Sequence, residues 1–169
     1  NLGLRADMDA LPIHETTGKE YASSHAGLMH ACGHDGHTAM LLAAAEYLAR
    51  DGKFSGTLNL IFQPAEEGAG GAVKMMEDGL FDKHPCDAVF AMHNMPGFEA
   101  GKLVFREGAT MASSDNVSIT ITGIGGHGAL PHLTADPIVA ASSIVMALQT
   151  VVSRNVDPMQ AAVVTVGAI

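Results

Sequence analysis

The feature that most constrains the fold is the alternation of strand and helix patterns along the first two thirds of the chain. Short apolar runs with β-branched and aromatic residues, such as GTLNLIFQ, are typical of buried strands. Between them lie runs with helical spacing, such as TAMLLAAAEYLAR, which end near a glycine. Strands that alternate with helices predict an α/β fold, a layered domain with a mostly parallel central sheet. We predict strands at 2–6, 56–63, 86–93 and 101–108, and helices at 38–50 and from 70 to about Gly79.

The pattern changes near Ser113. The run NVSITITGIG alternates in the way of a half-exposed antiparallel strand, and AAVVTVGAI predicts a further strand. Between them DPIVAASSIVMALQTVVSR predicts a helix with Asp136 as its N-cap and Pro137 at its first position. We therefore predict two incomplete domains, 1–112 and 113–169, the second being the start of a smaller α+β domain. Both ends of the chain lie inside apolar runs, so we expect a fragment of a longer protein.

Composition excludes several classes of protein. The chain is 47% hydrophobic, as globular proteins are, and its formal net charge is −9. Its nine Lys and Arg residues form no cluster, which argues against a nucleic-acid partner. We find no apolar run long enough to cross a bilayer, so we expect no membrane partner. Two cysteines are too few for a disulfide framework, and this fits a reducing cytoplasm.

The stretch HACGHDGH, residues 30–37, concentrates metal-binding side chains on a flexible backbone. It has four explanations: a polar surface loop, a nucleophilic Cys32 activated by His30 or His34, a structural metal site, or a catalytic metal site. A helix that starts at Thr38 is expected to favour the Cys32 thiolate.

Other reactive residues follow the predicted strands. Asp7 and Asp9 follow the first strand, Glu66 and Glu67 follow the second, and His93 closes the third. The carboxyl ends of strands in an open α/β sheet line one crevice, where ligands bind. Thiolate, imidazole and carboxylate together suit zinc or a similar metal, and one of two neighbouring carboxylates can bind metal while the other acts as a base. A catalytic metal site is favoured, because a cysteine nucleophile leaves the glutamates and His93 without a role and structural zinc sites are usually rich in cysteine.

Five motifs, in order, resemble the amidohydrolase branch of the aminoacylase/carboxypeptidase metallopeptidase family: LRADMDALPI, HACGHDGHTAMLL, IFQPAEEGAGGA, AMHNMP and GIGGHGALPHLTADPI. Hippurate hydrolase, N-acyl-amino-acid amidohydrolases and auxin-conjugate hydrolases belong to that branch. The resemblance covers essentially the whole chain. It implies a two-domain enzyme with a dinuclear centre of zinc or manganese that hydrolyses the amide bond of N-acyl amino acids.

The resemblance also implies roles for single residues. Glu66 is the general base that acts on a metal-bound water, and His127 stabilises the tetrahedral oxyanion in the active site of a partner subunit. Asp9 orients a ligand, whereas Asp7 replaces a histidine of more distant relatives and its role stays open. The implied metal ligands are Cys32, His34, Glu67 and His93.

The same resemblance implies a small N-acyl amino acid as substrate and a ferredoxin-like lid domain that forms a homodimer. Family members are more than twice as long as this chain, and their last metal-ligating histidine lies in a later segment. We therefore expect the chain on its own to be inactive or nearly so. The alternatives are a peptidase or dipeptidase of the same family, a hydrolase that depends on Cys32, and a non-catalytic metal-binding fragment.

Overall fold

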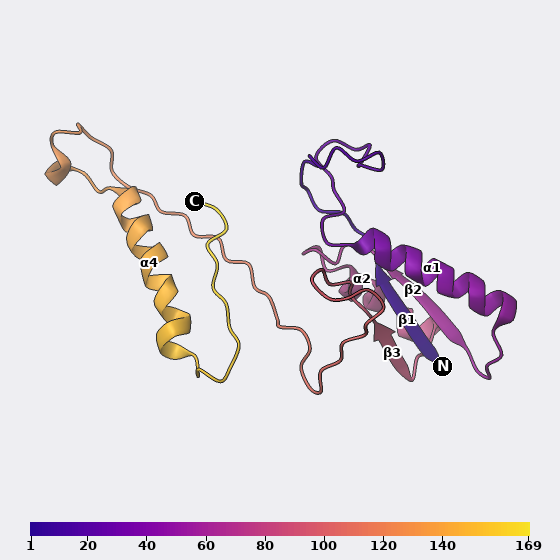
Figure 1. Ribbon diagram of the computed structural model, residues 1–169. Coiled ribbons are helices and arrows are strands. Elements are labelled where there is room, and N and C mark those ends of the chain that lie inside the picture. The colour runs from indigo at the N-terminus through magenta and orange to yellow at the C-terminus, as the bar shows by residue number, and fades with distance from the viewer. The chain divides into compact units, whose positions relative to one another are not determined.

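The computed structural model describes residues 1–169, which form two compact units (Figure 1). The first unit is Asn1–Leu103 and the second is Val104–Ile169. The domain boundary predicted from the sequence lies near Ser113. It differs from the boundary between the two units by the segment 104–112, which contains neither helix nor strand.

The first unit is built on a three-stranded parallel sheet. Its strands are β1 (Leu2–Asp7), β2 (Leu58–Gln63) and β3 (Ala88–Ala91), in the order β2-β1-β3. Leu2 pairs with Leu58 on one side and with Ala88 on the other, so the three strands end at the same edge of the sheet. The α/β class and the parallel sheet that the sequence predicted for this unit are confirmed.

Three helices accompany this sheet: α1 (His34–Asp51), α2 (Gly71–Glu77) and α3 (Leu80–Lys83). α1 packs against β1 and β2, and α2 packs against β2. The prediction that the first helix starts at Thr38 is wrong. Gly33 has a left-handed φ of 83° and serves as the N-cap, so that His34 is already helical.

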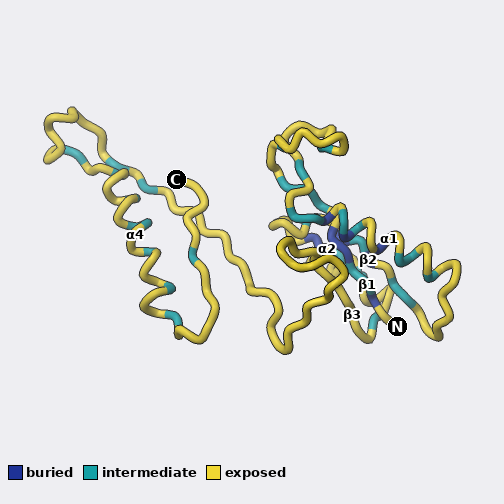
Figure 2. The backbone as a smooth tube through the Cα atoms, viewed as in Figure 1, coloured by how far each residue is buried: buried dark blue, intermediate teal, exposed yellow.

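The buried core of the first unit lies between β1, β2 and α1, where Figure 2 shows the buried part of the chain. The apolar members are Ala6, Leu41 and Ile61. The remaining buried side chains are polar and belong to Asp7, His34, His37 and Gln63. Polar side chains are rarely buried without hydrogen-bond partners or a function. The buried polar side chains therefore indicate a functional site at this end of the sheet.

The second unit contains the helix α4 (Pro137–Asn155) and a short 3-10 helix, Pro131–Leu133. Asp136 caps α4, because its Oδ1 accepts a hydrogen bond from the backbone N–H of Ile138 at 2.9 Å. The predicted helix, its N-cap and the proline at its first position are confirmed.

Three predicted strands do not form, at 101–108, 116–125 and 161–169. In the second unit only an isolated antiparallel bridge joins Ile124 to Ala135. A strand is stable only when a neighbour pairs with its N–H and C=O groups, and these segments have no such neighbour. The alternation of apolar and polar residues in these segments is a β pattern, but a local pattern does not supply that partner, so the three strand predictions are wrong.

α4 corrects the expectation that no apolar run could cross a bilayer. It has 19 residues and a mean hydropathy of 1.3, so its length and composition meet the requirement. None of that window is buried. Core helices of soluble proteins have the same length and composition, so this property assigns no location.

Candidate metal centre

The predicted metal ligands, the candidate base Glu66 and the two aspartates meet where the three strands of the first unit end. Asp7 is the last residue of β1, Asp9 follows it, and the two glutamates follow β2. His93 lies just beyond β3 rather than closing it, because β3 ends at Ala91. The first turn of α1 brings His34 to the same place. This convergence follows from the parallel strand order, in which all three carboxyl ends share one edge.

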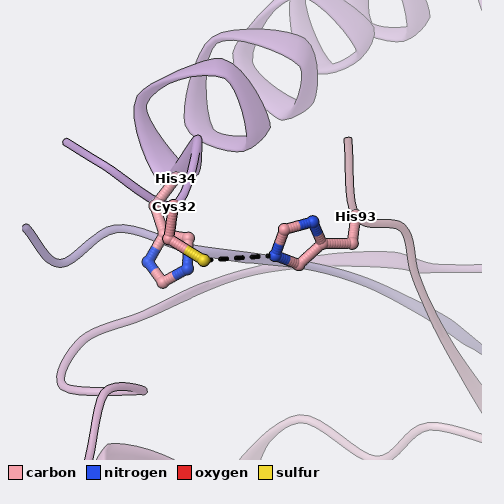
Figure 3. Close-up of side chains that lie close together, drawn as sticks. All are labelled: Cys32, His34 and His93. Carbon is pink, nitrogen blue, oxygen red and sulfur yellow. Dashed lines mark hydrogen bonds between the residues drawn. The ribbon is translucent and has the colours of Figure 1, made fainter. Parts of the chain in front are cut away.

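Cys32, His34 and His93 form the first group of possible metal ligands (Figure 3). One ligand atom from each lies within 4.8 Å of the other two. Figure 3 shows the thiol of Cys32 directed at the ring of His93, with Sγ and Nε2 separated by 3.5 Å. Nδ1 of His93 donates to the carbonyl oxygen of Asn94, which leaves the lone pair of Nε2 free. His93 therefore presents an imidazole nitrogen to the thiol in the tautomer that binds metal.

His34 carries the observation that best tests whether a metal ion fits. Its side chain is 1% exposed, and Nδ1 lies 3.2 Å from Oδ1 of Asp9. With the Nδ1 proton donated to Asp9, Nε2 is an acceptor, and it is the buried side-chain polar atom that has no hydrogen-bond partner. Leaving such an atom unpaired costs about 1–3 kcal/mol. A metal ion at Nε2 would remove that cost, so the residues fit a metal.

Asp9 links His34 to the glutamate loop. Its Oδ2 accepts a hydrogen bond from the backbone N–H of Glu67 at 2.9 Å. Burial raises the pKa of Asp9, but the N–H groups of Glu67 and Glu66 outweigh that effect, and its pKa lies below the usual value. Asp9 is therefore a charged carboxylate that orients His34, as carboxylates do beside metal-bound histidines.

Glu66 and Glu67 form a second group with His34. Oε1 of Glu67 lies 3.8 Å from Nε2 of His34, the unpaired nitrogen. Both glutamates are exposed, and they follow Ala65, whose φ of 52° is in the left-handed region. A non-glycine residue is rarely found there, and such strain is typical of functional sites.

Asp7 is buried and has two partners, which gives it the role that the sequence left open. Arg5 Nη1 donates to its Oδ2 at 2.7 Å, and Nδ1 of His37 donates to its Oδ1 at 2.6 Å. Burial raises the pKa of Asp7, but the hydrogen bond from His37 and the charge of Arg5 outweigh it, so its pKa is lowered. Asp7 thus anchors Arg5 and His37.

Sequence reasoning missed His37 and Asn94, which contact each other beside the predicted ligands. The spacing could have identified His37, because it lies one helical turn after His34 and therefore on the same face of α1. No comparable signal marks Asn94 beyond its position next to His93.

The thiol of Cys32 differs from the expectation. Burial raises its pKa, and the hydrogen bond to Glu67 and the charges of Glu67, Glu66 and Asp7 raise it further. The helix start was expected to favour the thiolate, but burial and, after it, the neighbouring carboxylates raise the pKa of the thiol instead. Without a bound cation the thiol stays protonated, which disfavours a nucleophilic cysteine.

His127 lies in the second unit and is exposed. Its Nδ1 accepts a hydrogen bond from the backbone N–H of Ala129 at 3.1 Å. A neutral imidazole in that arrangement carries its proton on Nε2, so His127 presents a hydrogen-bond donor.

An open cavity of about 530 Å³ adjoins the first group of ligands. Cys32 and His93 border it together with the apolar side chains of Met95 and Pro96. Its volume lies within the range of small-molecule sites.

The chain is similar to curated proteins that are named as hydrolases and deacetylases. Hippurate hydrolase of Campylobacter jejuni is 58% identical over 167 residues, which are 99% of this chain and 43% of that protein. An IAA-amino acid hydrolase of Arabidopsis thaliana is 50% identical over 169 residues, covering 99% of this chain and 38% of its own length. The chain thus spans about two fifths of the curated relatives it matches.

A solved structure and a protein-family pattern also match this chain. The Bacillus subtilis YXEP protein, described as a dinuclear metal binding peptidase from the M20 family, has a TM-score of 0.61 and 38% identity. The match covers 88% of this chain and 39% of that one. The pattern of Peptidase family M20/M25/M40 matches residues 3–167. The resemblance that the sequence motifs carried is confirmed, and the chain belongs to peptidase family M20/M25/M40.

Proposed function

We propose that the full-length protein that carries this chain hydrolyses the amide bond of N-acyl amino acids with two divalent metal ions. The observation that carries this proposal is the unpaired Nε2 of buried His34, which lies among a thiol, a second imidazole and a carboxylate. That donor set suits zinc or a similar borderline metal, and the family resemblance adds manganese as a candidate. The named activities of the relatives support the same reaction class, as does the description of the Bacillus subtilis protein as dinuclear.

Within this proposal, four residues hold the ions: Cys32, His34, Glu67 and His93. When bound, the ions polarise the scissile carbonyl and make the attacking water more acidic. Asp9 keeps the Nε2 lone pair of His34 directed at the centre by holding the proton on Nδ1. The remaining ligand comes from outside these residues, so the chain on its own is inactive or nearly so.

Glu66 moves the protons of the reaction. It is exposed and adjacent to the ligand Glu67, so it can take a proton from the attacking water and give it to the leaving amine. His127 donates its Nε2–H to the oxyanion that forms when the water attacks.

The cavity beside Cys32 and His93 receives the substrate, and Met95 and Pro96 give it an apolar wall for an acyl group. Rates on N-acetyl, N-benzoyl and indole-acetyl amino acids, with dipeptides as a fourth class, identify the acyl group. Turnover of dipeptides alone would favour the alternative, a peptidase or dipeptidase.

The domain that begins near Ser113 forms a homodimer in this proposal. Apolar side chains of α4 support it, because Ile138 and Met146 are 72% and 69% exposed. Light scattering of the full-length protein checks it, and a monomer would contradict it. A cysteine ligand must stay reduced, which favours the cytoplasm.

Cys32 distinguishes a metal enzyme from a cysteine hydrolase. Because a carboxylate can also bind zinc or manganese, Cys32→Asp is expected to keep part of the metal and part of the turnover, and a chelator is expected to abolish wild-type activity. Metal content and hydrolysis are measured on the same samples, with Cys86→Ala as the control that changes the other cysteine. Full activity in chelator, together with an acyl adduct on Cys32 in the mass spectrum, would establish the cysteine mechanism instead.

A further inference from the structure

Asn94 connects the two segments that carry the predicted ligands. Its backbone nitrogen and its Oδ1 lie 2.9 Å and 3.0 Å from Nε2 of His37. Its Nδ2 donates to the carbonyl oxygen of Gly33 at 3.3 Å. Asn94 follows His93 directly, so one side chain joins the segment after β3 to the start of α1.

His37 is a rigid anchor for this connection. It is 3% exposed, and its Nδ1 donates to Asp7, which Arg5 also holds. Thr38 ties the same helical turn to β1, because its hydroxyl donates to the carbonyl oxygen of Asp7 at 3.1 Å. The imidazole is therefore fixed to both β1 and α1.

Asn94 also lies close against the backbone of Gly33. A Cβ on Gly33 would lie 2.3 Å from Oδ1 of Asn94, and its φ of 83° disfavours other residues as well. The carbonyl of Gly33 also accepts the backbone N–H of His37 at 3.1 Å. Because Gly33 stands between Cys32 and His34, its contact with Asn94 restrains the backbone that carries both residues.

His37 could itself be considered a ligand, since Asp7, His34 and His37 also have ligand atoms within 4.8 Å of one another. Both of its ring nitrogens, however, are already engaged, Nδ1 by Asp7 and Nε2 by Asn94. The unpaired nitrogen in this group belongs to His34. His37 is thus part of the support and has no lone pair to offer a metal.

We propose that Asp7, His37 and Asn94 form a positioning clamp that fixes Cys32 relative to His93 and so sets the affinity of the metal centre. This inference rests on the proposed function, because it needs a metal at those residues. Asn94 also lines the cavity proposed for the substrate, so the clamp is tested by metal binding and not by turnover. Partners of this kind typically change metal affinity on the order of 10–100-fold when they are removed.

Cobalt(II) is the probe, because a cobalt ion bound by a thiolate gives a charge-transfer absorption that reports on the Cys32 ligand. In the full-length protein, Asn94→Ala removes the hydrogen bond from Nδ2 to the carbonyl oxygen of Gly33, while its backbone N–H still donates to Nε2 of His37. It is not expected to unfold the chain, since Asn94 is exposed. We expect its dissociation constant for cobalt to rise by on the order of 10-fold or more, with a shifted or weakened charge-transfer band. Asn94→Ser is a second variant, for which the same loss is expected.

Asn59→Ala is the matched control. Asn59 also uses its Nδ2 to donate to a backbone carbonyl, that of Pro85 at 3.1 Å, but it lies near the amino end of β2. We expect its cobalt affinity and spectrum to match the wild type. Wild-type affinity and spectrum in both Asn94 variants would overturn the clamp and leave the proposed function standing. A wild-type protein that gives no thiolate band with cobalt would overturn both.

Discussion

Replacing Glu66 with glutamine is expected to lower turnover by about 10²–10⁴-fold while metal content stays at the wild-type level, because glutamine keeps the shape of the side chain but cannot accept or return a proton. The full-length protein is assayed on an N-acyl amino acid, and metal is measured in the same preparation. Glu77→Gln is the control, since Glu77 is an exposed glutamate that pairs with Lys74 on α2.

The two readouts separate two roles for Glu66. Glu66 belongs to a group with His34 and Glu67 that could itself hold a metal ion. A variant that loses metal together with turnover would make Glu66 a ligand, and a variant with near-normal turnover would exclude it as the base.

His34→Gln is expected to remove the stabilisation that metal gives the folded protein. The glutamine side chain offers no imidazole nitrogen at the position of Nε2, although its amide can still donate toward Asp9. A ligand at 100 times its dissociation constant stabilises a protein by about 2.7 kcal/mol, so zinc or manganese is expected to raise the unfolding temperature of the wild type but not of this variant.

The metal-free proteins are expected to unfold at similar temperatures, because His34 leaves Nε2 unpaired when no metal is present. Thermal unfolding with chelator and with added metal gives both comparisons. His84→Gln, an exposed histidine at the end of α3, is the control and should respond to metal as the wild type does. An equal response to metal in His34→Gln would show that His34 is not a ligand.

Local patterns were enough to predict the sheet of the first unit. The runs that became β1, β2 and β3 each have a neighbour within the same unit, so a β pattern in the sequence led to a paired strand. The same kind of pattern at 116–125 and 161–169 did not lead to a strand, because a strand also needs another segment with which it can pair. Helix α4 needed no partner to form, and its capping aspartate could be read directly from the sequence.

The candidate site was predictable where it depends on strand order. Parallel strands end at one edge, which is why residues as distant as Asp9, Cys32 and His93 could be grouped before the fold was known. The early start of α1 was missed, because Gly33 does not resemble the usual polar N-cap. The partners of Asp7 and the contacts of Asn94 depend on distances between side chains, which no spacing in the sequence specifies.

The most direct test of the metal-dependent mechanism is the rate at which the full-length, metal-depleted protein releases glycine from N-benzoylglycine as zinc or manganese is added back. We predict almost no release without metal and a rate that rises until about two ions are bound per chain, as a dinuclear centre requires. Full release by the metal-depleted protein, or no release from any N-acyl amino acid once two ions are bound, would contradict this mechanism.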